Sequence, residues 1–167
     1  LLKQWTHEIG NQKHIEDLHI VSPFFDQGGR MGPVSEFKKP YIHLYLTERL
    51  GKSKPEYRLS VSKQALARIH PECCVISNRW MVGNTQDSEA KKKAADIKTR
   101  VLHAKMYAAR SGKFGWALLG SPNFTNRAMV AGGGQRNAEA AIALRGKWTE
   151  IARMLPPVEK TVPWKEI

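Results

Sequence analysis

Two apolar, strand-like segments at residues 101–109 and 114–119 constrain the fold of this chain most, because only a short stretch containing Ser111 and Gly112 separates them. Serine and glycine favour tight turns, so the spacing predicts two strands joined by a turn. Residues 137–144 form a further apolar segment and predict a third strand close behind. The C-terminal half of the chain is therefore expected to be rich in β-structure.

The rest of the chain alternates between strand and helix patterns. Mixed strands and helices over the whole length predict an α/β layered fold. The sequence shows no internal repeat and no low-complexity tract. The remaining predicted strands are residues 18–21, 41–46, 57–61 and 73–77, and the predicted helices are residues 1–10, 63–69 with Ser62 as N-cap, 124–130, and 147–155 ending before Pro156-Pro157.

The chain is strongly basic, with 27 Lys and Arg against 15 Asp and Glu and a formal net charge of +12. Such an excess favours polyanionic partners through the electrostatic field and through counterion release. Nucleic acid is the first candidate partner and an anionic membrane surface the second. A charge that serves only solubility remains an alternative. No apolar run approaches the roughly 20 residues that a membrane-spanning helix needs.

The length and the cysteines bound the organisation of the protein. A chain of 167 residues suits one domain, residues 1–167, and its first residue is not Met, so we expect a piece of a longer protein. The two cysteines, Cys73 and Cys74, are adjacent and precede an apolar pair. At least one is expected to be a buried hydrophobe, and neither the spacing nor the nearby histidines predict a zinc site. Cysteines of this kind favour a reduced, cytoplasmic protein.

His103 and Lys105 are the first candidate catalytic pair. Alternate residues of a strand share one face, so the two side chains are expected to point the same way, followed by Tyr107. An imidazole can attack phosphorus or move a proton near neutral pH, and an ammonium can hold phosphoryl oxygens. The opposite face of this predicted strand is apolar and consists of Leu102, Ala104, Met106 and Ala108.

Two further motifs follow the His-x-Lys triplet. The apolar segment at 114–119 ends in a Gly-Ser-x-Asn turn, and an Asn-x-Glu triplet opens the next apolar segment. In this order and at this spacing the motifs resemble those of the phospholipase D superfamily, and residues 18–26 look like the opening strand of one family repeat. The matching residues are His103, Lys105, Gly120, Ser121, Asn123 and Glu139.

The resemblance implies a fold and a mechanism. The fold would be a single phospholipase D-like repeat, with a mixed β-sheet flanked by helices on both faces. His103 would be one of two histidines, of which one attacks phosphorus to form a phosphohistidine and the other protonates the leaving group and then activates water. Lys105 and Asn123 would hold the phosphoryl oxygens, and Glu139 would orient His103. No metal and no cofactor are expected.

Three further residues are candidates for substrate binding. Ser121 would support the phosphoryl group by hydrogen bonding, as the resemblance implies. Arg127 and Arg136 flank the Gly-Ser-x-Asn turn and a glycine-rich stretch, where they could contact a phosphate backbone, with a purely solubilising role as the alternative. His19 and His43 lie within predicted strands among apolar residues and are expected to be structural.

The sequence departs from the family pattern at two points. The family motif continues to an Asp, His-x-Lys-x-x-x-x-Asp, where this chain has Arg110; the tyrosyl-DNA phosphodiesterase branch also lacks this Asp. In addition, only His103 among the six histidines is followed by a lysine two residues later. A complete site would need a second half, supplied by a homodimer or by a second phospholipase D-like repeat of the full-length protein.

Three functions remain open on these grounds. The first is a metal-independent phosphodiesterase, a phosphoric diester hydrolase acting as a nuclease on DNA or RNA, which the charge and the departure from the lipid-type motif favour. The second is a phospholipase or phosphatidyl transferase, which is disfavoured by the lack of a membrane-inserting amphipathic stretch and by a high basic charge without an apolar face. The third is a non-catalytic nucleic-acid-binding module with a relic site.

Overall fold

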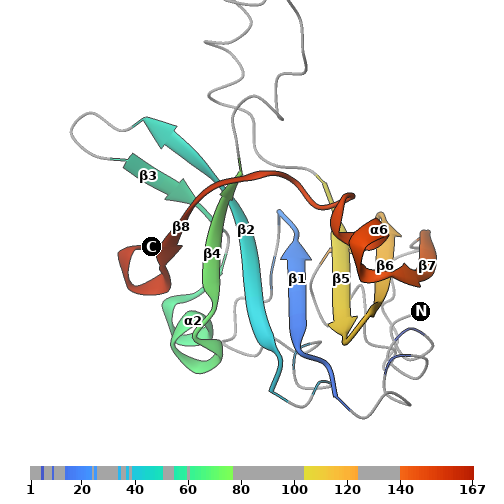
Figure 1. Ribbon diagram of the computed structural model, residues 1–167. Helices are drawn as coiled ribbons and strands as arrows, with labels where there is room; N and C mark the ends of the chain where they lie inside the picture. Colours follow the sequence, from blue (N-terminus) through green and yellow to red (C-terminus); the bar gives the residue numbers. More distant parts are fainter. Residues whose placement is uncertain are drawn as a thin grey trace, which may run out of the picture.

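The protein is described by a computed structural model, in which the described residues form an open, mixed sheet of eight strands with short helices (Figure 1). The described residues are 14–23, 39–50, 55–59, 61–76, 104–123 and 140–167, with the single positions Trp5, Ile9, Phe25, Val34 and Phe37. The elements are β1 (Asp17–Val21), β2 (Tyr41–Leu50), β3 (Pro55–Arg58), α2 (Lys63–Ile69), β4 (Glu72–Ile76), β5 (Met106–Ser111), β6 (Phe114–Gly120), β7 (Ala141–Lys147), α6 (Trp148–Ala152), β8 (Val158–Pro163) and the 3₁₀ helix η2 (Trp164–Glu166).

The strand order is β7-β6-β5-β1-β2-β4-β8, and β3 pairs with β2 outside this path. β1, β2 and β4 run parallel to one another, whereas β5 is antiparallel to β1 and begins an antiparallel meander with β6 and β7. β8 closes the other edge, antiparallel to β4. The predicted α/β class is thus confirmed in general terms, as an open mixed sheet.

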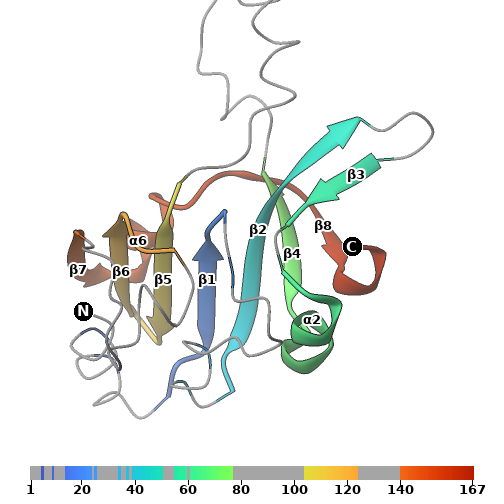
Figure 2. The same cartoon turned by 180° about the vertical axis from the view of Figure 1, so that it is seen from behind.

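Both faces of the sheet are buried near its centre. The first core lies on one face, where α2 packs through Leu66, and the second core lies on the other, where α6 packs through Ile151. Figure 1 shows α6 in front of the sheet, and Figure 2, from behind, shows α2 in front. The first core includes Leu18, Ile20, Leu44, Tyr107 and Trp116, and the second includes Val21, Tyr45, Cys74, Met106 and Ala108.

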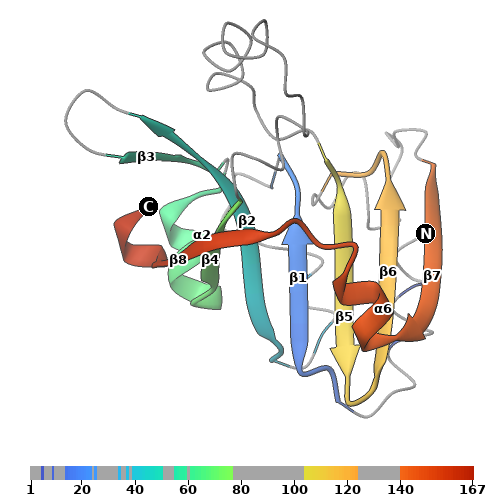
Figure 3. The ribbon, with the colours of Figure 1, turned by 45° about the horizontal axis from the view of Figure 1, so that its top comes forward.

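The expectation of helices flanking both faces is not supported. Within the described ranges, helices with defined bounds are confined to α2 and α6 and the short η2, and α2 and α6 comprise seven and five residues. Much of the second face is instead crossed by the chain that runs from α6 to β8 (Figure 3), and Leu155 of this segment packs against the second core. An extended segment covers the face because Pro156 and Pro157 prevent the helix from continuing.

Several predicted elements are confirmed with small shifts of their ends. The helix at 63–69 has the predicted bounds and the predicted cap, since Ser62 Oγ accepts a hydrogen bond from Ala65 N at 3.2 Å. Gly112 has a φ of 55° in the turn between β5 and β6, a conformation that favours glycine. Trp5 and Ile9 are helical and buried, in agreement with the predicted first helix. The predicted helix at 124–130 lies outside the described residues.

Other predictions were wrong in their bounds. The strand predicted at 57–61 is β3, which ends at Arg58, because Leu59 and Val61 leave the ladder to pack against the first core. The strand predicted at 137–144 begins at Ala141 and extends to Lys147, which pairs with Phe114 and so shortens the following helix. β8 was not predicted at all, because three consecutive polar residues separate its two valines and no alternating pattern marks it as a strand.

No helix among the described residues has the length and apolar character needed to cross a membrane.

We expect the substitution Ser62→Ala to lower the free energy of unfolding by about 1 kcal/mol, because the amide of Ala65 loses its capping acceptor. Ser62→Asp, which restores an acceptor at the N-cap, should retain most of the stability. Urea denaturation followed by circular dichroism measures both. Equal midpoints for Ser62→Ala and the unsubstituted protein would show that the cap contributes nothing.

Candidate functional site

The described parts of the three sequence motifs meet at one edge of the sheet. Lys105 directly precedes β5, Ser121 directly follows β6, and Ala140 directly precedes β7. Because these three strands are antiparallel neighbours, all three positions lie at the same end of the strands, which is also where β1 ends (Figure 3). We call this end the motif edge.

Hydrogen bonds join the segments at the motif edge directly. Gly120 N donates to Lys105 O at 3.3 Å, and Ser121 N donates to Ala140 O at 2.9 Å. The Ser121 hydroxyl accepts from Ala140 N at 3.0 Å and lies 3.4 Å from Ala140 O. Ser121 therefore ties the Gly-Ser-x-Asn turn to the residue that follows Glu139.

The turn is also fixed from beneath by Tyr107. The side chain of Tyr107 is fully buried, and its hydroxyl donates to Pro122 O at 2.6 Å. At Gly120 a Cβ atom would collide with Ala140 O and the backbone of Ala141, so this crossing of β6 and β7 needs glycine. The first residue of the Gly-Ser-x-Asn motif is thus required by the close approach of two strands.

Asn123 ends the turn with an unusual side-chain environment. Its Oδ1 atom is buried and has no hydrogen-bond partner among the described residues. Leaving a buried amide oxygen unpaired costs about 1–3 kcal/mol, so native proteins rarely do so without a reason. Lys105, half-buried, stands at the same edge.

The predicted environment of the His-x-Lys strand was wrong in one respect. We expected the face with Tyr107 to be open, but Tyr107 and Ala109 lie in the first core and Met106 and Ala108 in the second, so both faces of β5 are packed. The strand also begins at Met106, not at residue 101. Lys105 lies at the edge of the sheet because it precedes the strand, and not because one face of the strand is open.

Four of the predicted site residues lie outside the described residues, namely His103, Arg127, Arg136 and Glu139. The roles of these four residues stay predictions.

Arg110 occupies the place of the family's motif Asp, at the end of β5 opposite the motif edge. Its Nε atom donates to Asp17 Oδ2 at 2.5 Å, and its guanidinium lies 3.0 Å from Glu16 Oε2. These contacts bind the start of β1 to the end of β5. The position therefore supports the fold in this chain, with a charge opposite to that of the family residue.

A row of charged and polar side chains crosses the second face at that opposite end. It runs over four adjacent strands as Arg110 of β5, Asp17 of β1, His43 of β2 and Glu72 of β4. His43 Nε2 lies 3.4 Å from Asp17 Oδ1, and His43 Nδ1 lies 2.9 Å from Glu72 Oε2. Burial alone would raise the pKa of Asp17, but hydrogen bonds from Arg110 and His43 hold it below its usual value of 3.8.

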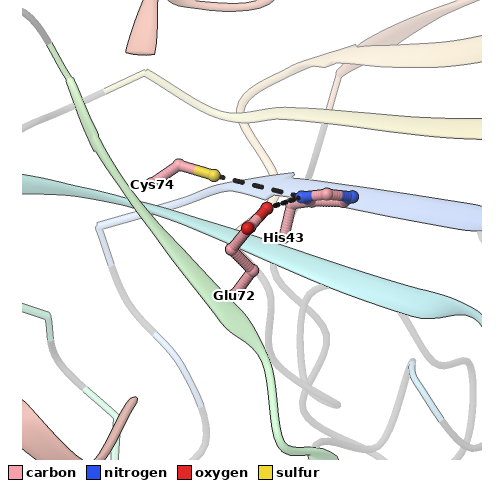
Figure 4. Close-up of side chains that lie close together, drawn as sticks. All are labelled: His43, Glu72 and Cys74. Atoms are coloured by element: carbon pink, nitrogen blue, oxygen red, sulfur yellow. Dashed lines mark hydrogen bonds and ion pairs between the residues drawn. The ribbon is translucent and has the colours of Figure 1, made fainter. Parts of the chain in front are cut away.

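Cys74 extends this row, with its Sγ atom 4.0 Å from His43 Nδ1 (Figure 4). Cys73 points to the other face and packs with Leu46 and Val75. Both thiols are free and buried, as predicted for at least one of them. Burial, assisted by the charge of Glu72, raises the pKa of each to about 12.

His19 is the buried neighbour of the row. Its ring stacks on that of His43, with 4.2 Å between the two ring centroids. The ring of Trp148 in α6 is tilted against the ring of His19, and their centroids are 5.3 Å apart. His19 Nδ1 is 3.1 Å from the Tyr45 hydroxyl. Burial, assisted by the charge of His43, lowers the pKa of His19 to about 3. His19 is therefore a neutral, packed histidine, as the sequence predicted.

The sequence did not indicate the grouping of His43, Glu72 and Cys74. Glu72 and Cys74 are two residues apart and share a strand face, which is visible in the sequence. The position of His43 opposite them follows only from the register of β2 and β4, which pairs His43 with Glu72.

We expect Tyr107→Phe to lower the free energy of unfolding by about 1–2 kcal/mol, because the buried Pro122 carbonyl loses its donor. The backbone amides of Ser121 and Asn123, on either side of Pro122, should also exchange hydrogen faster. Hydrogen exchange measured by NMR or mass spectrometry tests this, and unchanged protection of the turn would contradict it.

We also expect stability to fall as the pH decreases from about 6.5 towards 3. In the unfolded chain His19 takes up a proton below its ordinary pKa of 6.5, whereas the folded protein resists protonation until about 3, so acid favours unfolding. The protonation of His19 in the unfolded chain alone should lower the free energy of unfolding by about 2 kcal/mol between pH 7 and pH 5. His19→Phe should flatten that part of the curve in urea titrations; an equally steep curve would refute the assignment.

Comparison with models of known protein families gives no match to this chain, and no curated protein is significantly similar to it.

Proposed function

We propose that this chain is a phospholipase D-like repeat that supplies one half of a metal-independent phosphodiesterase site and acts as a nuclease on DNA or RNA. The observation that carries the proposal is the motif edge. There Lys105, the Gly-Ser-x-Asn turn and the residue after Glu139 come together through direct hydrogen bonds, although they are far apart in sequence.

The proposed reaction has two displacements at phosphorus. In the first, one of two histidines, for which His103 is the residue in this chain, forms a nitrogen–phosphorus bond as the ester phosphorus–oxygen bond breaks. The other histidine gives its proton to the departing oxygen. In the second, that histidine takes a proton from water, the water oxygen bonds to phosphorus, and the nitrogen–phosphorus bond breaks to release a phosphomonoester.

The remaining residues would stabilise charge and position the base. Lys105 and Asn123 would hold the non-bridging oxygens, on which negative charge increases in the transition state. Asn123 would do so through its Nδ2 amide, which donates; its buried Oδ1, without a partner among the described residues, is left to accept from a donor that the site gains on binding. Glu139 would orient His103, Ser121 would brace the turn, and Arg127 and Arg136 would contact the nucleic-acid backbone.

The charge and the second half-site define the proposed substrate and assembly. A net charge of +12 favours a nucleic acid over a neutral lipid headgroup. Because the chain has one His-x-Lys triplet, the second histidine would come from a second copy of the chain or from another repeat of the full-length protein.

To test the proposal, end-labelled single- and double-stranded oligonucleotides of DNA and RNA are incubated with the protein in EDTA. We expect cleavage that rises more steeply than linearly with protein concentration, since two copies complete a site. His103→Ala should abolish cleavage, and Lys105→Ala should slow it by about 100-fold or more. A histidine-linked oligonucleotide should be trapped on denaturing gels by alkaline quenching.

Lys113→Ala is the matched control, because it removes the same charge from an exposed lysine in the β5–β6 turn at the far end of the strands. It should retain the cleavage rate within about twofold, as surface charges away from a site have small effects. Binding without cleavage at every concentration would refute the proposed activity and favour a binding module. Hydrolysis of phosphatidylcholine in place of nucleic acid would refute the proposed substrate.

A further inference from the structure

Three metal-ligating atom types gather on the second face, away from the motif edge. His43 Nδ1, Glu72 Oε2 and Cys74 Sγ all lie within 4.8 Å of one another (Figure 4). They come from two adjacent parallel strands whose ladder pairs His43 with Glu72 and Tyr45 with Cys74. The rigid backbone of the sheet therefore sets their spacing.

The surroundings of His43 indicate what this group could bind. Both of its ring nitrogens face carboxylate oxygens, with Asp17 at 3.4 Å and Glu72 at 2.9 Å. A neutral imidazole has one N–H group and donates to only one of these carboxylates, whereas a protonated ring donates to both. A cation between His43 Nδ1 and Glu72 would take the place of the second proton, because the lone pair of Nδ1 would then face the cation and Nε2–H would donate to Asp17.

This arrangement of carboxylate, imidazole and cation is the one by which proteins commonly orient a metal-binding histidine. Asp17 is itself held by Arg110, whose guanidinium reaches it from β5. A series of fixed contacts thus runs from Arg110 through Asp17 to the ring of His43. This support fixes the orientation of the ring, with Nε2 towards Asp17 and Nδ1 towards Glu72 and Cys74.

We propose that His43, Glu72 and Cys74 bind one zinc-like divalent cation, with Asp17 orienting the imidazole from its far side. A mixed set of nitrogen, oxygen and sulfur atoms suits Zn²⁺, whereas Mg²⁺ and Ca²⁺ prefer oxygen ligands. Three protein ligands leave the fourth tetrahedral position to water. Glu72, with a side chain 33% exposed, lies on the solvent side of the group.

The two distances from His43 Nδ1 fit a tetrahedral cation after small movements. Bonds of about 2.0–2.3 Å would hold neighbouring ligand atoms about 3.4–3.5 Å apart. The nitrogen–oxygen distance of 2.9 Å and the nitrogen–sulfur distance of 4.0 Å each have to change by about half an ångström towards that spacing. Side-chain rotation of Glu72 and Cys74 can supply such shifts without moving the strands.

The proposed cation site is separate from the proposed phosphodiesterase site. His43 pairs with His19, whereas the motif edge begins one residue beyond the pairing of Val21 with Met106, so His43 lies roughly 10 Å from that edge along the strands. Cys74 is level with Val21 but lies on β4, which is separated from β5 by β1 and β2. The cation would hold β2 and β4 together and take no part in cleavage. Binding of the cation and cleavage in EDTA are therefore tested independently, and either can fail alone.

The test uses metal-depleted, reduced protein titrated with ZnCl₂ in a calorimeter and with CoCl₂ in a spectrophotometer. We expect one Zn²⁺ per chain, a melting temperature that rises with Zn²⁺, and a near-ultraviolet thiolate-to-cobalt band. MgCl₂ should produce none of these. If the unsubstituted protein binds Co²⁺ without a thiolate-to-cobalt band, or binds neither metal, the proposal is overturned.

The adjacent cysteines provide a matched pair of variants. Cys74→Ala should weaken Zn²⁺ binding by at least about 100-fold, whereas Cys73→Ala, which removes an equally buried thiol on the opposite face, should bind as the unsubstituted protein does. Asp17→Asn should weaken binding by about 10- to 100-fold. Equal affinity in Cys74→Ala and Cys73→Ala would overturn the assignment of the ligands.

Discussion

The pairing of β1 with β5 is the contact on which the rest of this structure depends. It joins the parallel strands β1, β2 and β4 to the antiparallel meander of β5, β6 and β7, and it connects segments far apart in sequence, as Asp17 and Arg110 are 93 positions apart. Both strands are packed on both faces, so the hydrophobic effect fixes their register, because a shift by one residue would exchange the residues of the two cores. Arg110 adds a charged contact at one end. The motif edge at the other end inherits its geometry from this pairing.

Local patterns predicted the elements whose ends are set by local chemistry. The helix at 63–69 was predicted with its bounds because Ser62 caps it, and the turn at Gly112 because glycine tolerates its φ. Elements whose ends depend on distant partners were predicted poorly. The extension of β7 to Lys147 follows from pairing with Phe114, and β8 exists because the edge of β4 offers unpaired backbone groups to a short, mostly polar segment. Neither partner is visible in the local sequence.

The contrast between local patterns and distant partners also applies to the two groups of polar residues, those at the motif edge and those around His43. The order and spacing of the motifs were enough to predict that Lys105 and the Gly-Ser-x-Asn turn belong to one site, although Lys105 was placed within a strand that in fact begins at Met106. They were not enough to foresee that the Tyr107 face is buried, because burial on both faces of β5 requires the helix and strand neighbours that only the fold supplies. The grouping of His43 with Glu72 and Cys74 depends entirely on the register of two parallel strands, for which the sequence contains no local signal.

The two groups also differ in how firmly the fold holds them. His43, Glu72 and Cys74 lie within strands, where ladder hydrogen bonds on β2 and β4 fix the backbone and leave only side-chain rotation. Lys105, Ser121 and Asn123 lie just outside their strands, so their positions depend on a few specific bonds, chiefly those of Tyr107 and of the Ser121 hydroxyl. Sites built within strands are held more precisely than sites just beyond strand ends. This difference would suit the two proposed roles, because a small cation requires strict geometry, whereas a nucleic acid and a second half-site would require the edge residues to adjust.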